Sequence, residues 1–435
     1  MAMAVDSRRF TTRAAAEAYV GGVCFKLGPP RLIGAELEWL TARDDPARTR
    51  PDLGDIAAAL GPHAPTSIAP SSPALSLPSG SAVTIEPGGQ IELSSAPLSS
   101  AEDLCAALAA DEAVLRRLLR AAGITVRSCA ADRSRQAQRL LRLPRYRVME
   151  ERFDGIGPFG RLMMCNTAAT QVSVDAGADR AEVAARWRLL HDAGPALLAA
   201  FACSPRLRGV PDGGWASQRM RTWLELDPDR TRPPQTSDPV ADYGRWALDV
   251  PLLCVVGGRS VGGRSVGGRS VGGHSVGGRG VGGNADTDGD WSAPPGATFA
   301  DWIAGALDSE IDRRPDIADL DYHLTTLFPP VRAAGHLEVR YLDAQPGDRW
   351  RVPIAALAAL LDDRATIAEA IALASPTAGR WRDAAEFGLR DGELRRTASE
   401  LLFLAAARSP RFEEELASAA ERCCRGLTPA QEYRR

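Results

Sequence analysis

The sequence has almost no lysine. Lysine and arginine together number 52 among 435 residues, but Lys26 is the only lysine. This removes the lysine of a P-loop and argues against a Schiff-base lysine as a catalytic group. Any phosphate must therefore be bound by arginine side chains, backbone N–H groups or a metal ion.

The usual metal-binding patterns of cysteine and histidine are also missing. The eight cysteines are scattered, with no C-x-x-C pair and no cysteine–histidine spacing typical of zinc, and there are only five histidines. A structural zinc site is therefore not expected.

Long apolar runs are absent as well. The first ten residues form no hydrophobic run, and no stretch approaches the length of a membrane span. The formal net charge is -3 and the pI is near 6.1, which suggests neither nucleic acid nor an anionic membrane as a partner. We expect a soluble, cytoplasmic protein with reduced thiols whose partners are small molecules.

The bulk composition is that of a globular protein. With 45% hydrophobic and 25% charged residues, the chain can bury a substantial core. We expect a single catalytic domain formed by residues 1–255 and 285–435, with a helical layer over 351–425. Helices are predicted at 11–24, 53–60, 100–122, 145–154 and 180–202, and a strand at 124–129.

Residues 256–284 differ from the rest of the chain. They form successive pentads of Val-Gly-Gly-Arg/His-Ser/Gly, without an aromatic residue and with too much glycine to bury a core. We interpret this stretch as a disordered insertion in a surface loop. The alternative is a flexible, arginine-bearing arm that contacts polyanions, although a glycine-rich tract is more often a linker.

The most informative stretch is residues 81–94. Two runs of alternating apolar and polar residues flank Pro87-Gly88-Gly89, which is typical of two strands joined by a turn. Period two directs Val83, Ile85, Ile91 and Leu93 to a core. It places Glu86, Gln90, Glu92 and Ser94 on the opposite side.

Three other segments repeat this alternation, at residues 31–40, 163–175 and 336–343. If all four regions lie in one antiparallel sheet, its apolar face packs on helices. Its other face then gathers polar side chains from every strand, namely Glu36, Glu38, Glu86, Glu92, Gln171, Glu338 and Arg340.

Such a face needs positive charge. Two carboxylates about 4 Å apart repel by roughly 4 kcal/mol at an effective dielectric constant of about 20. Carboxylate oxygens are the ligands that Mg²⁺ prefers, together with substrate phosphates. The residues alone therefore suggest a surface that binds a metal–nucleotide complex. The alternative is a solvated sheet face with ordinary glutamate–arginine pairs.

The same segments resemble a known family. Residues 86–94, Glu-Pro-Gly-Gly-Gln-Ile-Glu-Leu-Ser, resemble the signature of plant-type glutamate–cysteine ligases, and residues 34–38 resemble their first acidic strand. Further similarities follow in the family's order: Arg145-Tyr146-x-x-Met149, residues 163–175, Arg219-x-x-x-Trp223-x-x-x-Asp227-x-x-Arg230, and Glu338-Val339-Arg340. Residues 322–332 resemble the actinobacterial branch, whose ligase opens ergothioneine biosynthesis.

The resemblance implies an α+β enzyme with a central, mainly antiparallel sheet flanked by helices, in the glutamine-synthetase-like class. It implies ATP-dependent formation of gamma-glutamylcysteine from L-glutamate and L-cysteine through a gamma-glutamyl phosphate, with Mg²⁺.

The resemblance also assigns roles to residues. It places Glu36, Glu38 and Glu92 at the metal, and it adds Glu86, Gln90 and Glu338 to the ATP- and metal-binding set. Arg340, Glu38 and Glu92 are the catalytic candidates. The substrate-binding candidates are Arg145, Tyr146, Thr167, Thr170, Gln171 and Arg219.

Three other interpretations remain open at this point. A related carboxylate–amine ligase would keep the acidic face and use another amine. A binding or scaffold protein would act through the glycine repeat. A regulatory homologue would bind glutamate or ATP without turnover.

Overall fold

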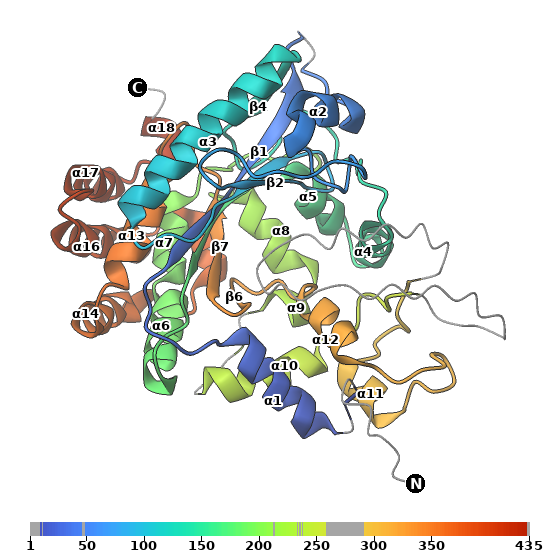
Figure 1. Ribbon diagram of the computed structural model, residues 1–435. Coiled ribbons are helices and arrows are strands. Elements are labelled where there is room, and N and C mark those ends of the chain that lie inside the picture. The colour runs from blue at the N-terminus through green and yellow to red at the C-terminus, as the bar shows by residue number, and fades with distance from the viewer. Residues whose placement is uncertain are drawn as a thin grey trace.

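A seven-stranded sheet organises the molecule (Figure 1). The structure is a computed structural model that describes residues 9–10, 12–45, 48–211, 214–232, 234, 236, 238–257 and 291–432. The strand order is β2-β3-β1-β5-β7-β6, and β4 pairs with the far end of β1. All named pairs are antiparallel. The expected α+β class with a mainly antiparallel sheet is confirmed.

The strands lie close to where the alternation predicts them. Their bounds are β1 (Ile33–Arg43), β2 (Ala82–Ile85), β3 (Ile91–Ser94), β4 (Ile124–Arg127), β5 (Ala169–Val174), β6 (Val331–Ala333) and β7 (Leu337–Asp343). Along β1, the apolar residues Ile33, Ala35, Leu37 and Trp39 are all at most 6% exposed. Alternate side chains of a strand point to opposite faces, so this face belongs to the core.

Helices from both halves of the chain pack on the apolar side of the sheet. α3 (Ala101–Ala121) contacts β1, and α7 (Gly194–Phe201) contacts β7. α13 (Arg351–Leu360), α14 (Arg364–Ala374), α16 (Gly392–Arg408) and α17 (Glu413–Cys424) gather on the same side in Figure 1, with α6 (Arg180–Asp192) below them. Residues 351–425 consist mainly of helices, which gather on this side of the sheet.

A second group of helices lies on the other side of Figure 1. It contains α4 (Pro144–Asp154), α5 (Phe159–Asn166), α8 (Gln218–Leu226), α9 (Pro228–Thr231) and α12 (Ile317–Leu324). α1 (Arg13–Cys24), α10 (Pro239–Asp249) and α11 (Phe299–Ala304) lie below the sheet. The remaining helices are α2 (Leu53–Leu60), α15 (Trp381–Phe387) and α18 (Pro429–Glu432).

Two sequence predictions need correction. Residues 163–166 are not the start of a strand, because they complete helix α5, whose Leu162, Met164 and Cys165 are buried. Leucine and methionine favour helices, and Thr167 Oγ1 donates 2.7 Å to the carbonyl of Met163, four residues earlier. The predicted helix 180–202 is two helices, because Pro195, in the first turn of α7, supplies no backbone N–H to continue α6.

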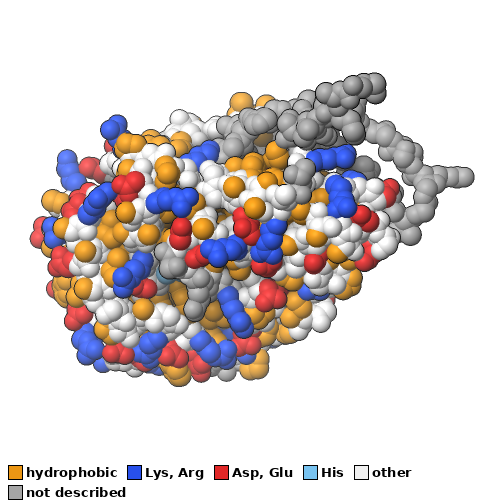
Figure 2. Space-filling view, turned by 90° about the horizontal axis from the view of Figure 1, so that it is seen from below, with side chains coloured by type: hydrophobic (Ala, Val, Ile, Leu, Met, Phe, Trp, Pro, Cys, Tyr) orange, Lys and Arg blue, Asp and Glu red, His pale blue; other side chains and the backbone are white. Residues whose placement is uncertain are grey.

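The described surface carries no large area of one charge sign on the face seen in Figure 2, where basic and acidic side chains are interspersed. Within the described ranges, no helix is long and apolar enough to cross a membrane. Of the repeat, only Val256 and Gly257 are described, so the prediction of disorder for this stretch concerns residues outside the described part.

Candidate active site

Strand pairing brings the predicted acidic residues onto one face of the sheet. Glu38 in β1 lies directly opposite Glu92 in β3, and Glu36 lies opposite Gln171 in β5. Like charges at directly opposed positions weaken a sheet. The fold therefore keeps a pair that its own stability does not favour, which is typical of a functional site.

Hydroxyl groups connect two of these carboxylates. Thr84 Oγ1 donates to Glu92 Oε1 at 2.6 Å, and Ser94 Oγ lies 3.1 Å from Glu92 Oε1 and 3.4 Å from Glu36 Oε1. Burial, with the charges of Glu86 and Glu38 nearby, raises the pKa of Glu92 to about 8. Burial, with Glu92 and Glu338 nearby, also raises the pKa of Glu36 well above its usual range. The raised pKa values favour the protonated form of both carboxyls as long as no cation lies beside them.

Glu38 is held by the strand beside it. Its Oε2 accepts from the backbone N–H of Ala169 at 2.8 Å, and its Oε1 accepts from Gln171 Nε2 at 2.9 Å. Burial raises the pKa of Glu38, although Arg219 and the Ala169 N–H oppose that increase. The carboxylate therefore has a fixed orientation on the acidic face.

The turn at residues 86–90 places Glu86 next to this group. Glu86 N–H donates to the carbonyl of Gln90 at 2.9 Å and closes the turn. Burial and the charges of Glu38 and Glu36 raise the pKa of Glu86 to about 7.

Gln90 differs from its predicted role at ATP or metal. Its Oε1 accepts from the Gly88 N–H at 3.0 Å, and its Nε2 donates to the carbonyls of Met164 at 3.2 Å and Thr167 at 2.9 Å. The side chain is 2% exposed, and these bonds use it to attach the turn to the end of α5. The geometry supports a structural role for Gln90 instead of a contact with substrate.

The two threonines that were predicted to bind substrate are both buried and do not fit that role. Thr170 pairs with Leu37, whose side chain faces the helices, and it is 1% exposed. Opposed residues share a face of the sheet, so Thr170 lies on the apolar side and not in the cleft. Thr167 is also buried, and its hydroxyl is bonded to the carbonyl of Met163.

Arginines lie beside the carboxylates. Arg332 Nε donates 2.8 Å to Glu338 Oε2, and Arg340 bonds to Glu338 Oε1. Burial alone would raise the pKa of Glu338, but the two guanidinium groups lower it to about 2. Glu338, predicted as an ATP or metal ligand, instead has both oxygens occupied by arginines and orients Arg340.

Arg219 and Trp223 lie next to Arg340. Arg219 is 2% exposed, and its Nη2 donates 2.7 Å to the carbonyl of Arg340. The guanidinium carbons of Arg219 and Arg340 lie 5.7 Å and 5.3 Å from the centre of the Trp223 ring. Cation–π contacts of this kind hold guanidinium groups in place. Trp223 belongs to the spaced motif, although a tryptophan at this place in the sequence alone suggests only a core position.

The other two members of that motif are structural. Asp227 and Arg230 form a buried ion pair at 3.3 Å, and Arg230 Nη1 and Nη2 donate to the carbonyls of Thr326 and Pro251. Asp227 and Arg230 therefore stabilise this segment, whereas Arg219 lies near Glu38 at the acidic face.

Arg145 and Tyr146 border the site from α4. Tyr146 is close enough to Glu86 and Glu92 that burial and these charges raise its pKa. Arg145 Nη1 donates 2.6 Å to Thr325 Oγ1 and Nη2 donates 2.8 Å to the Thr325 carbonyl, which connects α4 to the end of α12. The structure therefore brings Arg145 near Glu86 with its guanidinium already oriented.

His191 and His323 have structural surroundings. Burial lowers the pKa of both His191 and His323 to about 4, so both rings are neutral at pH 7. His191 Nδ1–H donates to the carbonyl of Trp187 and His323 Nε2–H to that of Ala247, both at 2.8 Å. Both bonds are to the backbone, as in a structural role.

Two buried polar atoms at this face have no partner. They are Gln171 Oε1, a hard acceptor beside Glu38, and Arg340 Nε, a donor beside Glu338. The first fits a cation and the second fits an anion. Magnesium with the phosphates of ATP would supply both charges.

This donor set fits Mg²⁺ bound with a substrate. In the part of the chain that the structure describes, no three carboxylate, imidazole or thiol groups are arranged to hold a metal ion alone. Mg²⁺ commonly uses only one or two protein carboxylates and completes its coordination with phosphates and water. The acidic face has the right chemistry for this mode of binding.

Comparison with known proteins identifies the family of this chain. The profile of glutamate-cysteine ligase family 2 (GCS2) matches residues 32–433. The chain is 34% identical over 440 residues to the glutamate–cysteine ligase EgtA of Mycobacterium tuberculosis, covering 99% of this chain and 91% of the relative. It is 27% identical over 365 residues to the chloroplastic glutamate–cysteine ligase of Medicago truncatula, covering 80% and 66% of the two chains.

One solved structure with a similar arrangement is the glutamate–cysteine ligase of Francisella tularensis in complex with AMP. The TM-score is 0.49 at 13% sequence identity, over 93% of this chain and 84% of that one. The family match covers most of the chain and includes every strand of the acidic face. The chain therefore belongs to glutamate-cysteine ligase family 2.

Proposed function

We propose that this protein joins L-glutamate to L-cysteine at the expense of ATP, giving gamma-glutamylcysteine, as the first step of ergothioneine biosynthesis. The observation that carries the proposal is the pairing of Glu38 with Glu92 on a sheet face beside Arg340 and Arg219. The identity to EgtA over nearly the whole chain supports the choice of substrates.

The reaction has two steps. An oxygen of the glutamate side-chain carboxylate attacks the gamma-phosphorus of ATP, and ADP leaves. The amine of cysteine then attacks the carbonyl carbon of the resulting acyl phosphate. The C–O bond to phosphate breaks, phosphate leaves with that oxygen, and the amine loses a proton. Both steps mainly need positioned reactants and neutralised charge.

In this proposal the arginines bind the anionic groups of the substrates. Arg340 has an unpartnered Nε and faces the phosphates, while Glu338 and Trp223 hold its guanidinium in place. Arg219, with Arg145 and Tyr146, binds the carboxylates of glutamate, because a guanidinium group matches a carboxylate with two parallel hydrogen bonds.

In the same proposal the acidic residues bind the cation. We assign Glu36, Glu38 and Glu92 to Mg²⁺, with Glu86 and the free Oε1 of Gln171 close by. A bound Mg²⁺ would neutralise phosphate charge. The protein's own contribution is to keep these oxygens oriented through Ala169, Thr84 and Ser94. A cytoplasmic location follows in this proposal from the use of ATP and of a free thiol as substrate.

Phosphate release from ATP tests the proposal. Purified protein with ATP and Mg²⁺ would be assayed with L-glutamate alone, with L-glutamate and L-cysteine, and with L-glutamate and a panel of other amines. We expect cysteine-dependent release and a product with the mass of gamma-glutamylcysteine. Faster release with another amine would move the chain to a related carboxylate–amine ligase. No release under any of these conditions would refute the ligase assignment.

A further inference from the structure

The junction between α5 and β5, residues 166–169, holds two parts of the acidic face at once. Ala169 N–H donates to Glu38 Oε2 at 2.8 Å, and the Thr167 carbonyl accepts from Gln90 Nε2 at 2.9 Å. Glu38 lies on β1, and Gln90 ends the turn that begins with Glu86. A shift of this junction would therefore move Glu38 relative to Glu86 and Glu92.

The turn leaves little freedom for such a shift. A Cβ atom on Gly88 would lie only 2.4 Å from the carbonyl oxygen of Cys165, at the end of α5. Leu140 N–H also donates 2.7 Å to the carbonyl of Pro87. The turn, the end of α5 and the segment around Leu140 thus form one packed unit behind the acidic face.

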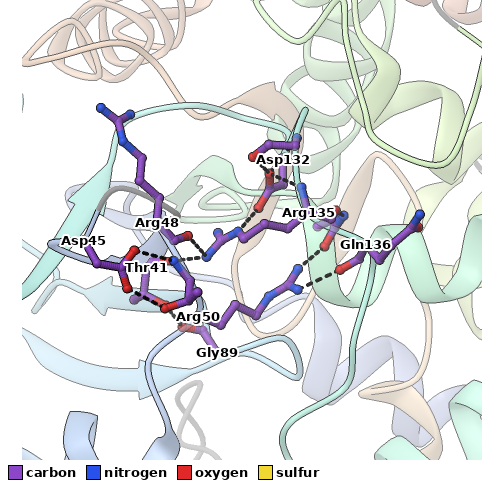
Figure 3. A network of polar contacts seen from close by, with 11 residues as sticks. Thr41, Asp45, Arg48, Arg50, Gly89, Asp132, Arg135 and Gln136 are labelled. Carbon is purple, nitrogen blue, oxygen red and sulfur yellow. Dashed lines mark hydrogen bonds and ion pairs between the residues drawn. The ribbon is translucent and has the colours of Figure 1, made fainter.

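A polar network braces this unit from outside (Figure 3). Arg50 donates to the side-chain oxygen of Asn166, the last residue of α5, and its Nη1 donates 2.6 Å to the carbonyl of Gln136. Asn166 is fully buried, and its Nδ2 donates 2.8 Å to the carbonyl of Arg135. One guanidinium group therefore fixes the buried amide at the start of the junction.

The network continues to the turn itself. Arg135 Nη1 donates 2.7 Å to the carbonyl of Thr41 in β1, and Thr41 Oγ1 donates 2.7 Å to the carbonyl of Gly89. Asp132, fully buried, accepts from Arg135 Nε at 2.5 Å. The two arginines thus approach the same unit from two sides, one through Asn166 and one through Thr41.

We propose that Arg50 is a positioning residue for the ligase reaction: through Asn166 it sets the place of the 166–169 junction and thereby the spacing of Glu38 from Glu86 and Glu92. It does not touch substrate in this role. Arg50 lies in the connection between β1 and α2, a segment whose composition suggests only a loose link.

Arg48 supplies a matched control. It is two residues away in the same connection and offers only its backbone carbonyl to Arg135 Nη1, at 3.5 Å. Its side chain extends away from the network in Figure 3. Arg50→Met and Arg48→Met each remove one positive charge, and Arg50→Lys removes none. Only the two substitutions at Arg50 affect the contact with Asn166.

The inference rests on the proposed function for its kinetic test. We expect Arg50→Met to lower kcat at least tenfold and to raise the Mg²⁺ concentration needed for half-maximal activity several-fold. Arg50→Lys should recover part of kcat, because an ammonium can still reach one of the two oxygens. Arg48→Met should stay within twofold of the unchanged protein. Equal kinetics for Arg50→Met and Arg48→Met would overturn the proposal.

Amide hydrogen exchange separates this inference from the proposed function, because it needs no turnover. In Arg50→Met, peptides covering residues 163–171 should exchange several-fold faster, while those of α16 and α17 stay unchanged. Unchanged exchange at 163–171 would refute the positioning role even in an active enzyme. Faster exchange throughout, or melting below the assay temperature, would also refute it, since Arg50 would then support the whole fold. If the protein without substitutions had no ligase activity, but Arg50→Met showed the expected exchange pattern, only the ligase proposal would be refuted.

Discussion

At the scale of single residues, the acidic face is a compromise between stability and chemistry. Glu38 and Glu92 oppose each other across two strands, and burial keeps water from screening them. Arg340 and Arg332 balance only Glu338 directly. In our proposal, a cation bound with the phosphates balances the remaining carboxylates, and this would distinguish the site from an ordinary set of ion pairs.

Replacing either opposed carboxylate should separate function from folding. Glu38→Gln and Glu92→Gln each remove a proposed metal-binding oxygen, so we expect kcat to fall well over tenfold. Each also relieves the repulsion between the opposed carboxyl groups, so we expect the thermal midpoint to stay equal or rise. Glu102→Gln, at a side chain that is 53% exposed, serves as the control. Unchanged kcat and Mg²⁺ dependence in both site variants would contradict the assignment.

The raised pKa values predict how stability depends on pH. The pKa of Glu86 is raised to about 7 and that of Glu92 to about 8, both above the roughly 4.3 of an unfolded glutamate. The folded state therefore holds extra protons between about pH 5 and 8. Their stabilising effect is lost as pH rises through about 7 and 8.

Thermal melts without nucleotide should show this effect. We expect the midpoint to fall between pH 6 and 8.5, and we expect both Mg²⁺ and Glu92→Gln to make that fall smaller. A midpoint that is constant or rises across this range would show that the carboxyls are not protonated in the folded state.

At the scale of elements, the turn at residues 86–90 decides the geometry. Gly88 packs against the backbone of Cys165, and Gly89 has a φ of +83°. A φ in this range is natural for glycine and strained for other residues. Glycine is therefore required at position 88 because the backbone of Cys165 lies so close, and at position 89 because of the backbone conformation.

Gly88→Ala tests this packing. Because the nearest atoms are backbone and cannot rotate away, we expect the free energy of unfolding to fall by about 1–3 kcal/mol and activity to fall with it. Gly22→Ala, in α1 with nothing within 4 Å, should instead stabilise by about 0.5–1 kcal/mol. Chemical denaturation measures both. Equal stability of the two variants would show that the turn can move away from α5.

The same elements show what sequence reasoning can reach. Period two in β1, β3 and β7 predicted which side chains share the acidic face, since alternation follows directly from strand geometry. The helix at 163–166 was missed, because a short apolar run suits either a helix or a buried strand. The bonds of Gln90 and the place of Thr170 depend on pairing register and on contacts between distant segments, which no local pattern specifies.

At the scale of the whole molecule, the glycine repeat interrupts the chain at one place. Val255 N–H donates 2.8 Å to the carbonyl of Trp291, and Cys254 pairs with Ser292. The chain therefore leaves and returns at neighbouring points, and Arg313 further supports this place by donating to the Val256 carbonyl. This arrangement favours a single catalytic domain in which the repeat is an insertion.

Replacing residues 258–290 with a short glycine–serine connection tests that view. The two flanks are already hydrogen bonded to each other. We therefore expect kcat to stay within about twofold, and the thermal midpoint within about 2 °C, of the values for the protein with the repeat. A large loss of activity with an intact fold would instead indicate that the repeat takes part in function, as the scaffold interpretation requires.

The account's central claim is that this acidic face makes a gamma-glutamyl phosphate. The most direct test supplies L-glutamate labelled with ¹⁸O in its side-chain carboxylate, together with ATP, Mg²⁺ and L-cysteine, and measures the mass of the released phosphate. The account predicts one ¹⁸O atom in each phosphate, because the attacking oxygen leaves with phosphorus when the amine attacks. Product formed with unlabelled phosphate would contradict it.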